Sequence, residues 1–216
     1  MSTSYDCNIP ETRQAGLAAA AETVRAGQLV VLPTDTVYGL GCDAFDSAAV
    51  RSLLSVKGRG PDMPVPVLVG SWTTIDGLVL SVPRQARALI EAFWPGGLSL
   101  VLNHAPSLAW DLGRTRGTVM LRMPLHPVAL ELLREVGPMA VSSANRSGQP
   151  PATTAEEARN QLAEDVPVYL DGGPAERATP STMVDLTGPA PRILRVGAVS
   201  SAEISEVLGV EVAVAD

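Results

Sequence analysis

The alternation of short apolar runs with helix-like segments is the feature that most limits how this chain can fold. Strands are expected at 29–32, 65–69, 98–102, 118–122, 139–142, 166–170, 181–186 and 192–196. Helices are expected at 11–26, 46–56, 83–93, 126–135, 154–163 and 201–208. Strands and helices that take turns along a chain are typical of α/β folds. We therefore predict an α/β fold with a twisted sheet flanked by helices.

The last two expected strands decide the kind of sheet. They are joined only by residues 187–191, a link too short for the crossover that parallel neighbours need. That pair is therefore expected to be antiparallel, and the sheet mixed. The 216 residues suit one domain, and no repeat or long linker divides them. We expect a single domain over 1–216, with a core at about 11–197 and a short C-terminal helix within 200–209.

Composition and charge exclude several classes of protein. Hydrophobic residues make up 46% and charged residues 18%, which is an ordinary globular composition. The net charge of -7 argues against a passive nucleic-acid coat protein, which would be basic. Cys7 and Cys42 form no C-x-x-C pair, and two histidines cannot build a His-rich metal site. No leader and no membrane-length apolar run are evident, so we expect a cytoplasmic protein without membrane contact.

The stretch from 29 to 69 reads as a βαβ-like unit with polar corners. Its first strand ends at Pro33, and Thr34, Asp35, Thr36 and Tyr38 follow directly. In open α/β sheets, ligands bind beyond the carboxyl ends of the strands. We expect the glycines at 39 and 41 to permit a positive φ or a close backbone approach. The first corner therefore predicts a ligand site.

A pair of cations forms the other corner of this unit. The helix expected at 46–56 begins with Asp46 as N-cap and runs into Lys57-Gly58-Arg59-Gly60. Lys57 is the only lysine among 16 basic residues. An ammonium differs from a guanidinium in shape, hydration and donor geometry. We therefore favour a functional role for Lys57 over chance retention on a solvated loop.

The common signatures of other enzyme classes are absent or out of context. No G-x-x-x-x-G-K-[ST] phosphate loop occurs. Gly39-x-Gly41-x-x-Ala44 matches the loose dinucleotide fingerprint, but six residues separate it from the strand. Ser143 and His126 could supply part of a hydrolase triad, yet no G-x-S-x-G elbow surrounds a serine. His126 is more consistent with a structural role at a helix start.

Polar and cationic side chains gather instead at the predicted strand ends. The clusters are 34–38, Lys57 with Arg59, Arg122, Ser143 and Asn145 with Ser147, Ser181-Thr182, and Arg195. Phosphoryl oxygens are bound best by charge-assisted donors. Phosphoryl transfer mainly needs positioning and charge neutralisation from the protein. The constellation indicates a phosphorylated nucleotide together with a small polar substrate.

The same residues resemble those of the YrdC family. The resemblance rests on residues 33–41 (PTDTVYGLG), the K-x-R of Lys57 and Arg59, the S-x-N of Ser143 and Asn145, Ser147-Gly148, Ser181-Thr182, and 193–197 (ILRVG). These motifs span nearly the whole chain in the family's order. In that family, K-x-R with a distant S-x-N marks threonylcarbamoyl-adenylate synthases, and this chain is similar to their short, single-domain form.

The resemblance implies a reaction and its partners. Such enzymes convert L-threonine, bicarbonate and ATP to threonylcarbamoyl-AMP and pyrophosphate. A carbamate formed on the threonine amine would attack the α-phosphorus. Mg²⁺ is implied too, held mainly by phosphates and water. The product supplies a tRNA modification, so tRNA-modification proteins and a contact with tRNA are further expectations.

The resemblance also implies site residues. The threonine site would consist of Thr36, Arg122, Val141 and Ser181. ATP would be held by Lys57, Arg59, Thr118, Ser143, Asn145, Pro151 and Arg195. The catalytic group would be Lys57, Arg59, Ser143 and Asn145, with no protein metal ligands. Met63 and Leu68 stand where the family often has an asparagine and a histidine.

Two alternatives stay open from the sequence. One is a non-catalytic double-stranded-RNA-binding module of the same fold, which would need a basic concave face. The other is a carbamoyl-transfer enzyme that works from carbamoyl phosphate. ATP-dependent release of pyrophosphate in the presence of threonine would separate the RNA-binding module from the synthase, and the carbamoyl-transfer enzymes usually form part of longer multidomain chains.

Overall fold

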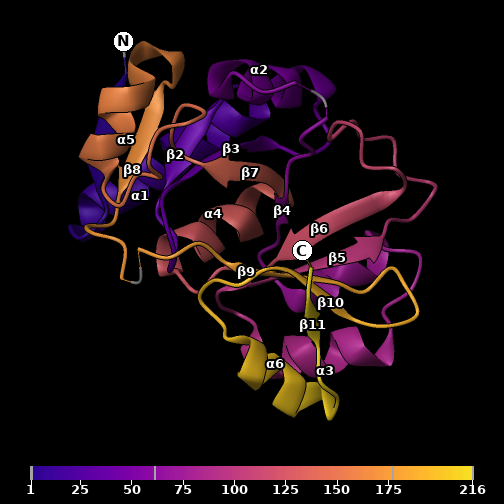
Figure 1. Cartoon of the computed structure of the whole chain (residues 1–216). Helices are drawn as coiled ribbons and strands as arrows, with labels where there is room; N and C mark the ends of the chain where they lie inside the picture. Colours follow the sequence, from indigo (N-terminus) through magenta and orange to yellow (C-terminus); the bar gives the residue numbers. More distant parts are fainter. Residues whose placement is uncertain (1, 61, 177, 216) are drawn as a thin grey trace.

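All strands of the described chain belong to one mixed sheet. The structure is a computed structural model that describes residues 2–60, 62–176 and 178–215 (Figure 1). Among these, eleven strands pair in the order β1-β8-β2-β3-β7-β4-β6-β5-β9-β10-β11. Their bounds are β1 Thr3–Asp6, β2 Val30–Leu32, β3 Gly39–Asp43, β4 Val67–Leu68, β5 Leu98–Asn103, β6 Thr118–Arg122, β7 Met139–Ser143, β8 Val168–Asp171, β9 Thr182–Asp185, β10 Arg192–Arg195 and β11 Ala213–Val214. The predicted mixed α/β class is confirmed.

The helices fall close to their predicted positions. They are α1 Pro10–Arg25, α2 Ser47–Lys57, α3 Arg84–Phe93, α4 Pro127–Val136, α5 Ala155–Leu162 and α6 Ser201–Leu208, with short 3-10 turns η1 Trp72–Gly77 and η2 Ala163–Asp165. Asp46 caps α2 as expected, because its carboxylate accepts the backbone N–H groups of Ala48 and Ala49. None of the helices in the described part of the chain has the length and apolar character that a bilayer crossing requires.

The strand pairing corrects the expected βαβ-like unit at 29–69. Residues 39–43, for which no strand was predicted, form strand β3, which runs antiparallel to β2. The next strand in the sheet is β7, from much later in the chain, and it is antiparallel to both β3 and β4. Helix α2 therefore connects β3 to β4 across β7. Strands β1 and β11 at the two edges of the sheet were not predicted either.

The glycines of β3 serve side-chain packing. Neither Gly39 nor Gly41 has a positive φ. A Cβ at Gly39 would lie 2.6 Å from Cγ1 of Val141, and one at Gly41 would lie 3.0 Å from Cγ2 of the same valine. Real Cβ atoms essentially never show contacts as short as that at Gly39, and the contact at Gly41 is tighter than most, so glycine leaves room for the neighbouring strand's side chain. In this structure the close approach to the glycines is made by Val141.

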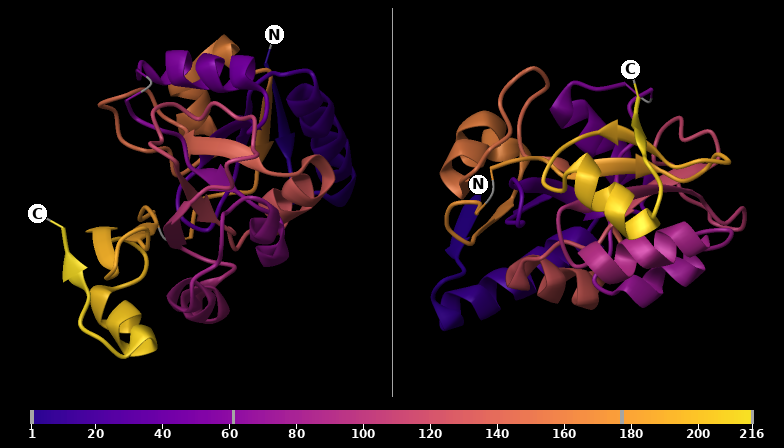
Figure 2. Two further views of the ribbon diagram at one scale, coloured as in Figure 1. Left: turned by 90° about the vertical axis from the view of Figure 1, so that its right-hand side faces the viewer. Right: turned by 60° about the horizontal axis from the view of Figure 1, so that its bottom comes forward.

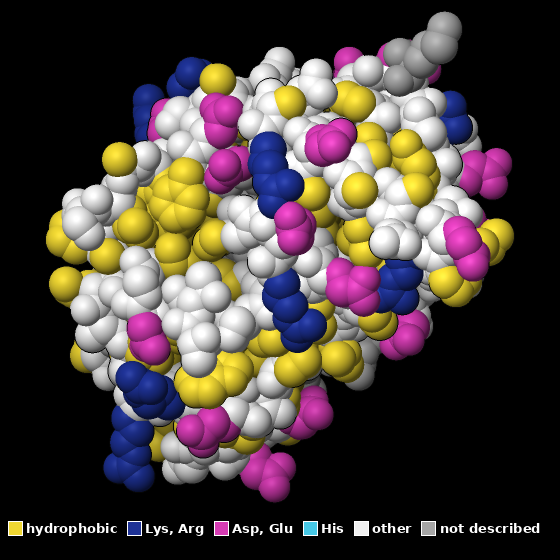
Figure 3. Space-filling model, turned by 180° about the vertical axis from the view of Figure 1, so that it is seen from behind, with side chains coloured by type: hydrophobic (Ala, Val, Ile, Leu, Met, Phe, Trp, Pro, Cys, Tyr) yellow, Lys and Arg dark blue, Asp and Glu magenta, His cyan; other side chains and the backbone are white. Residues whose placement is uncertain are grey.

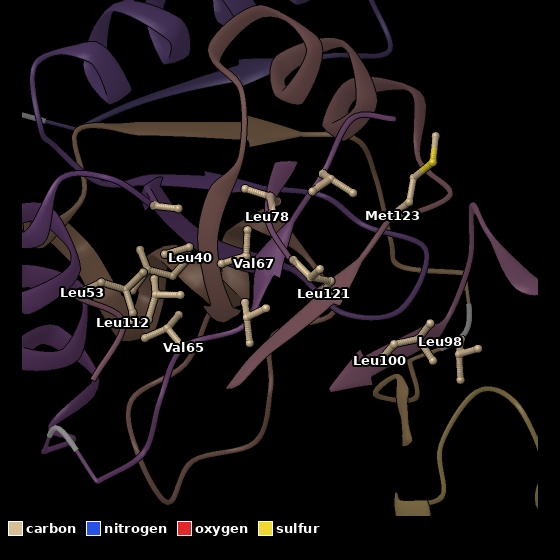
Figure 4. Close-up of a cluster of buried hydrophobic side chains, with 14 of the residues drawn as sticks. Leu40, Leu53, Val65, Val67, Leu78, Leu98, Leu100, Leu112, Leu121 and Met123 are labelled. Atoms are coloured by element: carbon tan, nitrogen blue, oxygen red, sulfur yellow. The ribbon is translucent and has the colours of Figure 1, made fainter. Parts of the chain in front are cut away.

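A continuous apolar row runs across the sheet and forms the centre of the larger core cluster. Register pairs join one residue from each of seven adjacent strands. The row consists of Cys42, Ala140, Val67, Leu121, Leu100, Val184 and Ile193, all 0% exposed. Figure 4 shows Val67, Leu100 and Leu121 among the neighbouring buried leucines. Helices α2, α3, α5 and α6 contribute side chains to this cluster.

A second, smaller core lies between the sheet and helices α1 and α4. Ala20, Ala21 and Val24 of α1 and Leu132 of α4 pack with residues of β2, β4, β7 and β8. The two helices lie side by side (Figure 2), and ion pairs Arg13–Glu131 and Arg25–Glu135 join them at the surface. Strands β2, β4 and β7 therefore contribute side chains to a core on each face of the sheet, which fixes the backbone that leads into the loop at 34–38 and into the S-x-N segment.

Candidate active site

Lys57 is buried where α2 ends. Gly58 follows in the left-handed conformation (φ 66°) and ends the helix, so Lys57 is its last residue. The side chain, only 1% exposed, points at the end of β7. Its ammonium donates to the carbonyl oxygen of Ser143 (2.5 Å), to Oδ1 of Asn145 (2.9 Å) and more weakly to Oγ of Ser143 (3.3 Å). The K-x-R and S-x-N motifs therefore meet through this lysine.

The partners of Lys57 leave its positive charge without compensation. An ammonium has three N–H donors, and the three oxygen acceptors around it are all neutral. Burial, together with the smaller effect of the nearby Arg59 charge, lowers the pKa of Lys57 from 10.5 to about 7. A buried cation of this kind would be stabilised by an anion placed beside it.

Arg59 lies next to the same strand end. Its Nη1 donates to Oγ of Ser142 at 3.3 Å. Its Nε is buried and has no hydrogen-bond partner among the described residues. Asn145 in turn donates to the carbonyl oxygens of Arg146 and Gln149, which fixes the loop after β7. Arg59 therefore brings donor capacity to a loop that the lysine and asparagine hold in place.

A second buried cation, Arg122, lies at the end of β6 and is clamped on three sides. Its Nε donates to the carbonyl oxygen of Gly96 (2.8 Å), its Nη1 to Oγ1 of Thr36 (2.8 Å), and its Nη2 to Oδ1 of Asp35. The same Asp35 oxygen accepts the backbone N–H of Leu125 at 2.9 Å. Burial lowers the pKa of Arg122, whereas the Asp35 carboxylate raises it.

The hydroxyl of Thr36 has a fixed direction. Thr34 uses its only hydroxyl proton on the carbonyl oxygen of Val37 at 2.6 Å. Thr36, whose Oγ1 lies 3.1 Å from that of Thr34, must therefore donate to Thr34 and accept from Arg122. A hydroxyl has two lone pairs, so Thr36 keeps one acceptor position for a further donor.

A third group forms around Ser181. Arg195 donates to the Ser181 carbonyl oxygen from Nη2 (2.7 Å) and Nε (3.1 Å). The Ser181 hydroxyl lies 2.9 Å from that of Ser99, a buried residue of β5. Thr182 has a structural part: its hydroxyl donates to the Val199 carbonyl oxygen and accepts two backbone N–H groups of the loop that follows β10. Ser181 and Arg195, which the sequence analysis placed in separate clusters, thus lie together in the structure.

The loop at 34–38 connects these groups. At one end, the backbone of Tyr38 is hydrogen bonded to Ala144, in the S-x-N segment, and to Ala152. At the other end, a Cβ built on Gly97 would meet Thr36 at 3.5 Å and Ala198 at 2.6 Å. The positive charge of Arg195 also lowers the pKa of Arg122. The S-x-N segment that Lys57 contacts therefore adjoins one end of this short, buried loop, and Arg122 contacts its other end at Thr36.

The structure does not join every predicted site residue to these groups. Thr118 begins β6, the strand that Arg122 ends, and its hydroxyl donates to the Thr115 carbonyl oxygen. Pro151 is exposed in the loop before α5. Val141 packs on the glycines of β3, as described above. No contact in the described structure tests whether these three touch a ligand.

The two departures from the family pattern have different surroundings. Leu68 is 4% exposed and belongs to the smaller core cluster. Met63 is 49% exposed in the loop after Arg59. His126 is the N-cap residue of α4 and makes no hydrogen bond to Ser143 in the described part of the chain, so the triad alternative receives no support. Burial lowers the pKa of His126, as befits a neutral structural imidazole.

Sequence reasoning missed three polar residues that complete the groups. Asp35 was noted beside the strand end but received no role. Ser142 was read as part of a buried strand, and Ser99 was not singled out within LSLVL. A serine that interrupts an apolar strand was the available signal for Ser99. Within the described residues, no group of three or more His, Cys, Asp or Glu side chains gathers to bind a metal.

A buried lysine with neutral partners and an arginine held by a carboxylate, both at strand ends of an α/β sheet, form an arrangement that suits anionic ligands. The family model for Sua5, YciO and YrdC, described as "Telomere recombination", matches residues 22–197. The chain therefore belongs to the Sua5/YciO/YrdC family, and the predicted membership is confirmed.

Individual relatives agree with this assignment. A protein of Mycobacterium tuberculosis, provisionally named a threonylcarbamoyl-AMP synthase, is 66% identical over 213 residues, which cover 99% of this chain and 98% of that protein. The threonylcarbamoyl-AMP synthase of Bacillus subtilis is 37% identical over 92% of this chain. The structure of Pyrococcus abyssi Sua5 in complex with L-threonine is similar over 100% of this chain, with a TM-score of 0.90 and 34% identity. This chain spans 58% of the B. subtilis protein and 62% of the P. abyssi structure.

Proposed function

We propose that this protein is an L-threonylcarbamoyladenylate synthase, which forms threonylcarbamoyl-AMP and pyrophosphate from L-threonine, bicarbonate and ATP. The observation that carries the proposal is the buried Lys57, whose hydrogen-bond partners are all neutral while Arg59 adds a second positive charge. Polyphosphate would supply the missing negative charge. The M. tuberculosis relative, similar over its whole length, supports the same activity.

ATP is assigned to the groups at the ends of α2, β7 and β10. Arg59 has an unpartnered buried Nε and is the first donor available to a phosphate. Lys57 contributes charge and holds Ser143 and Asn145 in place, because its three donors already have acceptors. Arg195 lies exposed at the end of β10 beside Ser181. Thr118 and Pro151 complete the proposed ATP contacts on the family resemblance alone.

Threonine is assigned to the loop at 34–38 and the end of β6. Arg122 would bind the carboxylate with N–H donors beyond the three that the clamp uses. Thr36 would accept from the substrate through its remaining lone pair. Ser181 and Val141 would complete the pocket. The L-threonine complex of P. abyssi Sua5 supports this choice of substrate.

The chemistry follows from this division. The threonine amine would take up carbon dioxide or bicarbonate to form a carbamate, whose oxygen attacks the α-phosphorus. The positive charges of Lys57 and Arg59 would stabilise the negative charge that develops toward pyrophosphate. Since the described residues offer no metal-ligand cluster, a Mg²⁺ ion would be carried by phosphate oxygens and water, as is usual for this ion.

Partners and location stay proposals. The product's use in tRNA modification implies partner proteins that consume it, and a contact with tRNA is proposed on the family resemblance alone. On the face shown in Figure 3, basic and acidic side chains are interspersed, so this face offers no continuous basic surface to an RNA duplex. Neither the RNA-binding alternative nor the carbamoyl-phosphate alternative gains support from the site. A cytoplasmic location and a single domain over 1–216 likewise remain predictions.

A pyrophosphate assay tests the proposed function. The purified protein is incubated with ATP and Mg²⁺, and L-threonine and bicarbonate are added separately or together. We expect pyrophosphate release, and a product with the mass of threonylcarbamoyl-AMP, only when all substrates are present. Turnover of carbamoyl phosphate in place of bicarbonate, or ATP cleavage that ignores threonine, would contradict the assignment.

A further inference from the structure

Asp35 is the charged residue of the site to which the proposed reaction assigns no part. It is 3% exposed and lies between Thr34 and Thr36 in the loop after β2. One of its oxygens, Oδ1, accepts two hydrogen bonds: one from Nη2 of Arg122 and one from the backbone N–H of Leu125. The carboxylate is therefore tied both to the arginine and to the chain that leaves the arginine's strand.

The surroundings of Arg122 determine what this tie does. A guanidinium is planar, and its N–H groups point in fixed directions. The Gly96 carbonyl oxygen fixes the Nε side, Thr36 fixes Nη1, and Asp35 fixes Nη2. Asp35 is the only one of these acceptors with a charge, so it makes the strongest of the three bonds. Without it, the outer part of the guanidinium could rotate away from Thr36.

The geometry points to Asp35 as the positioning residue that orients Arg122 for the carboxylate of the amino-acid substrate. Asp35 does not touch the substrate; it acts through the arginine. Its effect is therefore confined to the threonine side of the site, because the ATP groups at Lys57 and Arg59 make no contact with it in the described structure. The inference rests on the proposed function only in naming threonine as the ligand.

The test measures ligand binding by calorimetric titration of L-threonine and of ATP into separate variants. Asp35→Ala removes both hydrogen bonds, and we expect threonine to bind at least tenfold more weakly while the affinity for ATP changes less than about twofold. Asp35→Asn keeps an oxygen at the same place for both donors but removes the charge, so threonine affinity should fall less than in the alanine variant. An asparagine variant as weak as the alanine variant would overturn a positioning role.

A matched control and a double mutant separate positioning from general damage. Asp185 also accepts two hydrogen bonds with one oxygen, from the N–H and the hydroxyl of Thr187, and it lies on β9 away from Arg122. Asp185→Asn should leave threonine binding unchanged. In an Arg122→Ala background, Asp35→Ala should cause no further loss of threonine affinity, because the arginine through which it acts is gone. Additive losses would show that Asp35 acts independently and would overturn the inference.

A failed test of the Asp35 role can be distinguished from a failure of the proposed synthase activity. Threonine binding is measured without turnover, so the effect of Asp35 is scored whether or not threonylcarbamoyl-AMP forms. Should Asp35→Ala fail to fold, Asp35→Glu replaces it: the charge is kept, but one added methylene displaces the oxygen in a closed site. The same tenfold loss for threonine, with ATP binding retained, is expected. Wild-type affinity for threonine in that variant would refute the inference.

Discussion

Replacing Lys57 by methionine should change how the stability of this protein depends on pH. Methionine has a similar length and fills the same buried space without a charge. The structure gives the lysine neutral partners only, and burial lowers its pKa from 10.5 to about 7. A lysine in an unfolded chain keeps the ordinary value, so the two states bind protons differently between these values.

The direction and size of the effect follow from proton linkage. Between about pH 7 and 10.5 the unfolded chain holds a proton that the folded protein has begun to release. Stability therefore rises with pH in this window, and below it the full penalty of the buried charge is present. Each pKa unit corresponds to about 1.4 kcal/mol, which amounts to about 2 kcal/mol between pH 7 and pH 9 once the gradual titration of the folded form is included.

Urea unfolding of both proteins at a series of pH values measures this effect. All other titrating groups are shared, so the difference between wild type and Lys57→Met isolates the lysine. We expect the wild type to gain about 2 kcal/mol relative to the variant from pH 7 to pH 9. Parallel curves over that range would refute the reasoning, since they would mean that Lys57 keeps its ordinary pKa in the folded protein.

Three further predictions concern stability and use the same denaturation assay. Gly39→Ala should lower the free energy of unfolding by about 1–3 kcal/mol through overpacking, because the added Cβ would lie 2.6 Å from Val141. Val141→Ala in the same chain should restore most of that stability. If the double variant is as unstable as Gly39→Ala, the loss has another cause. Thr182→Val should lower the free energy of unfolding by about 2–4 kcal/mol, because it leaves two N–H groups and a carbonyl oxygen without partners. Thr182→Ser keeps the hydroxyl and should be nearly neutral. Equal losses of stability in the two variants would contradict this account. Ser200→Ala should lower the free energy of unfolding by about 1 kcal/mol, because it removes the capping box of α6. Ser201→Ala, one residue further along, should cost far less. A larger loss of stability for Ser201→Ala than for Ser200→Ala would rule out the cap.

Much of the fold could be predicted because its signals are local. Strand β6 and helix α6 were predicted at their observed bounds, since an apolar β-branched run and a capping serine are read from neighbouring residues. Strand β3 was missed because its glycines suggested a positive φ or a close backbone approach instead of a strand. Their actual cause is the side chain of Val141, about a hundred residues further along the chain, and no local pattern carries that information.

The candidate site shows the same limit. The sequence predicted which side chains would gather, and Lys57 does meet Ser143 and Asn145, as Arg122 meets Thr36. It could not predict which donors would already be used. That Lys57 has three neutral acceptors, or that Arg122 shares an oxygen of Asp35 with a backbone N–H, depends on contacts between segments far apart in the chain.

The interleaving of the sheet has a consequence for how the chain folds during synthesis. Strand β1 pairs with β8, and β8 also pairs with β2, while β7 lies between β3 and β4. A ribosome releases the first four strands well before residues 139–171 emerge. Until then, β3 and β4 expose open edges and β1 has no neighbour, which leaves a nascent chain prone to wrong pairing. The late strands therefore act as the closing pieces of the N-terminal half, and folding is completed only after most of the chain has left the ribosome.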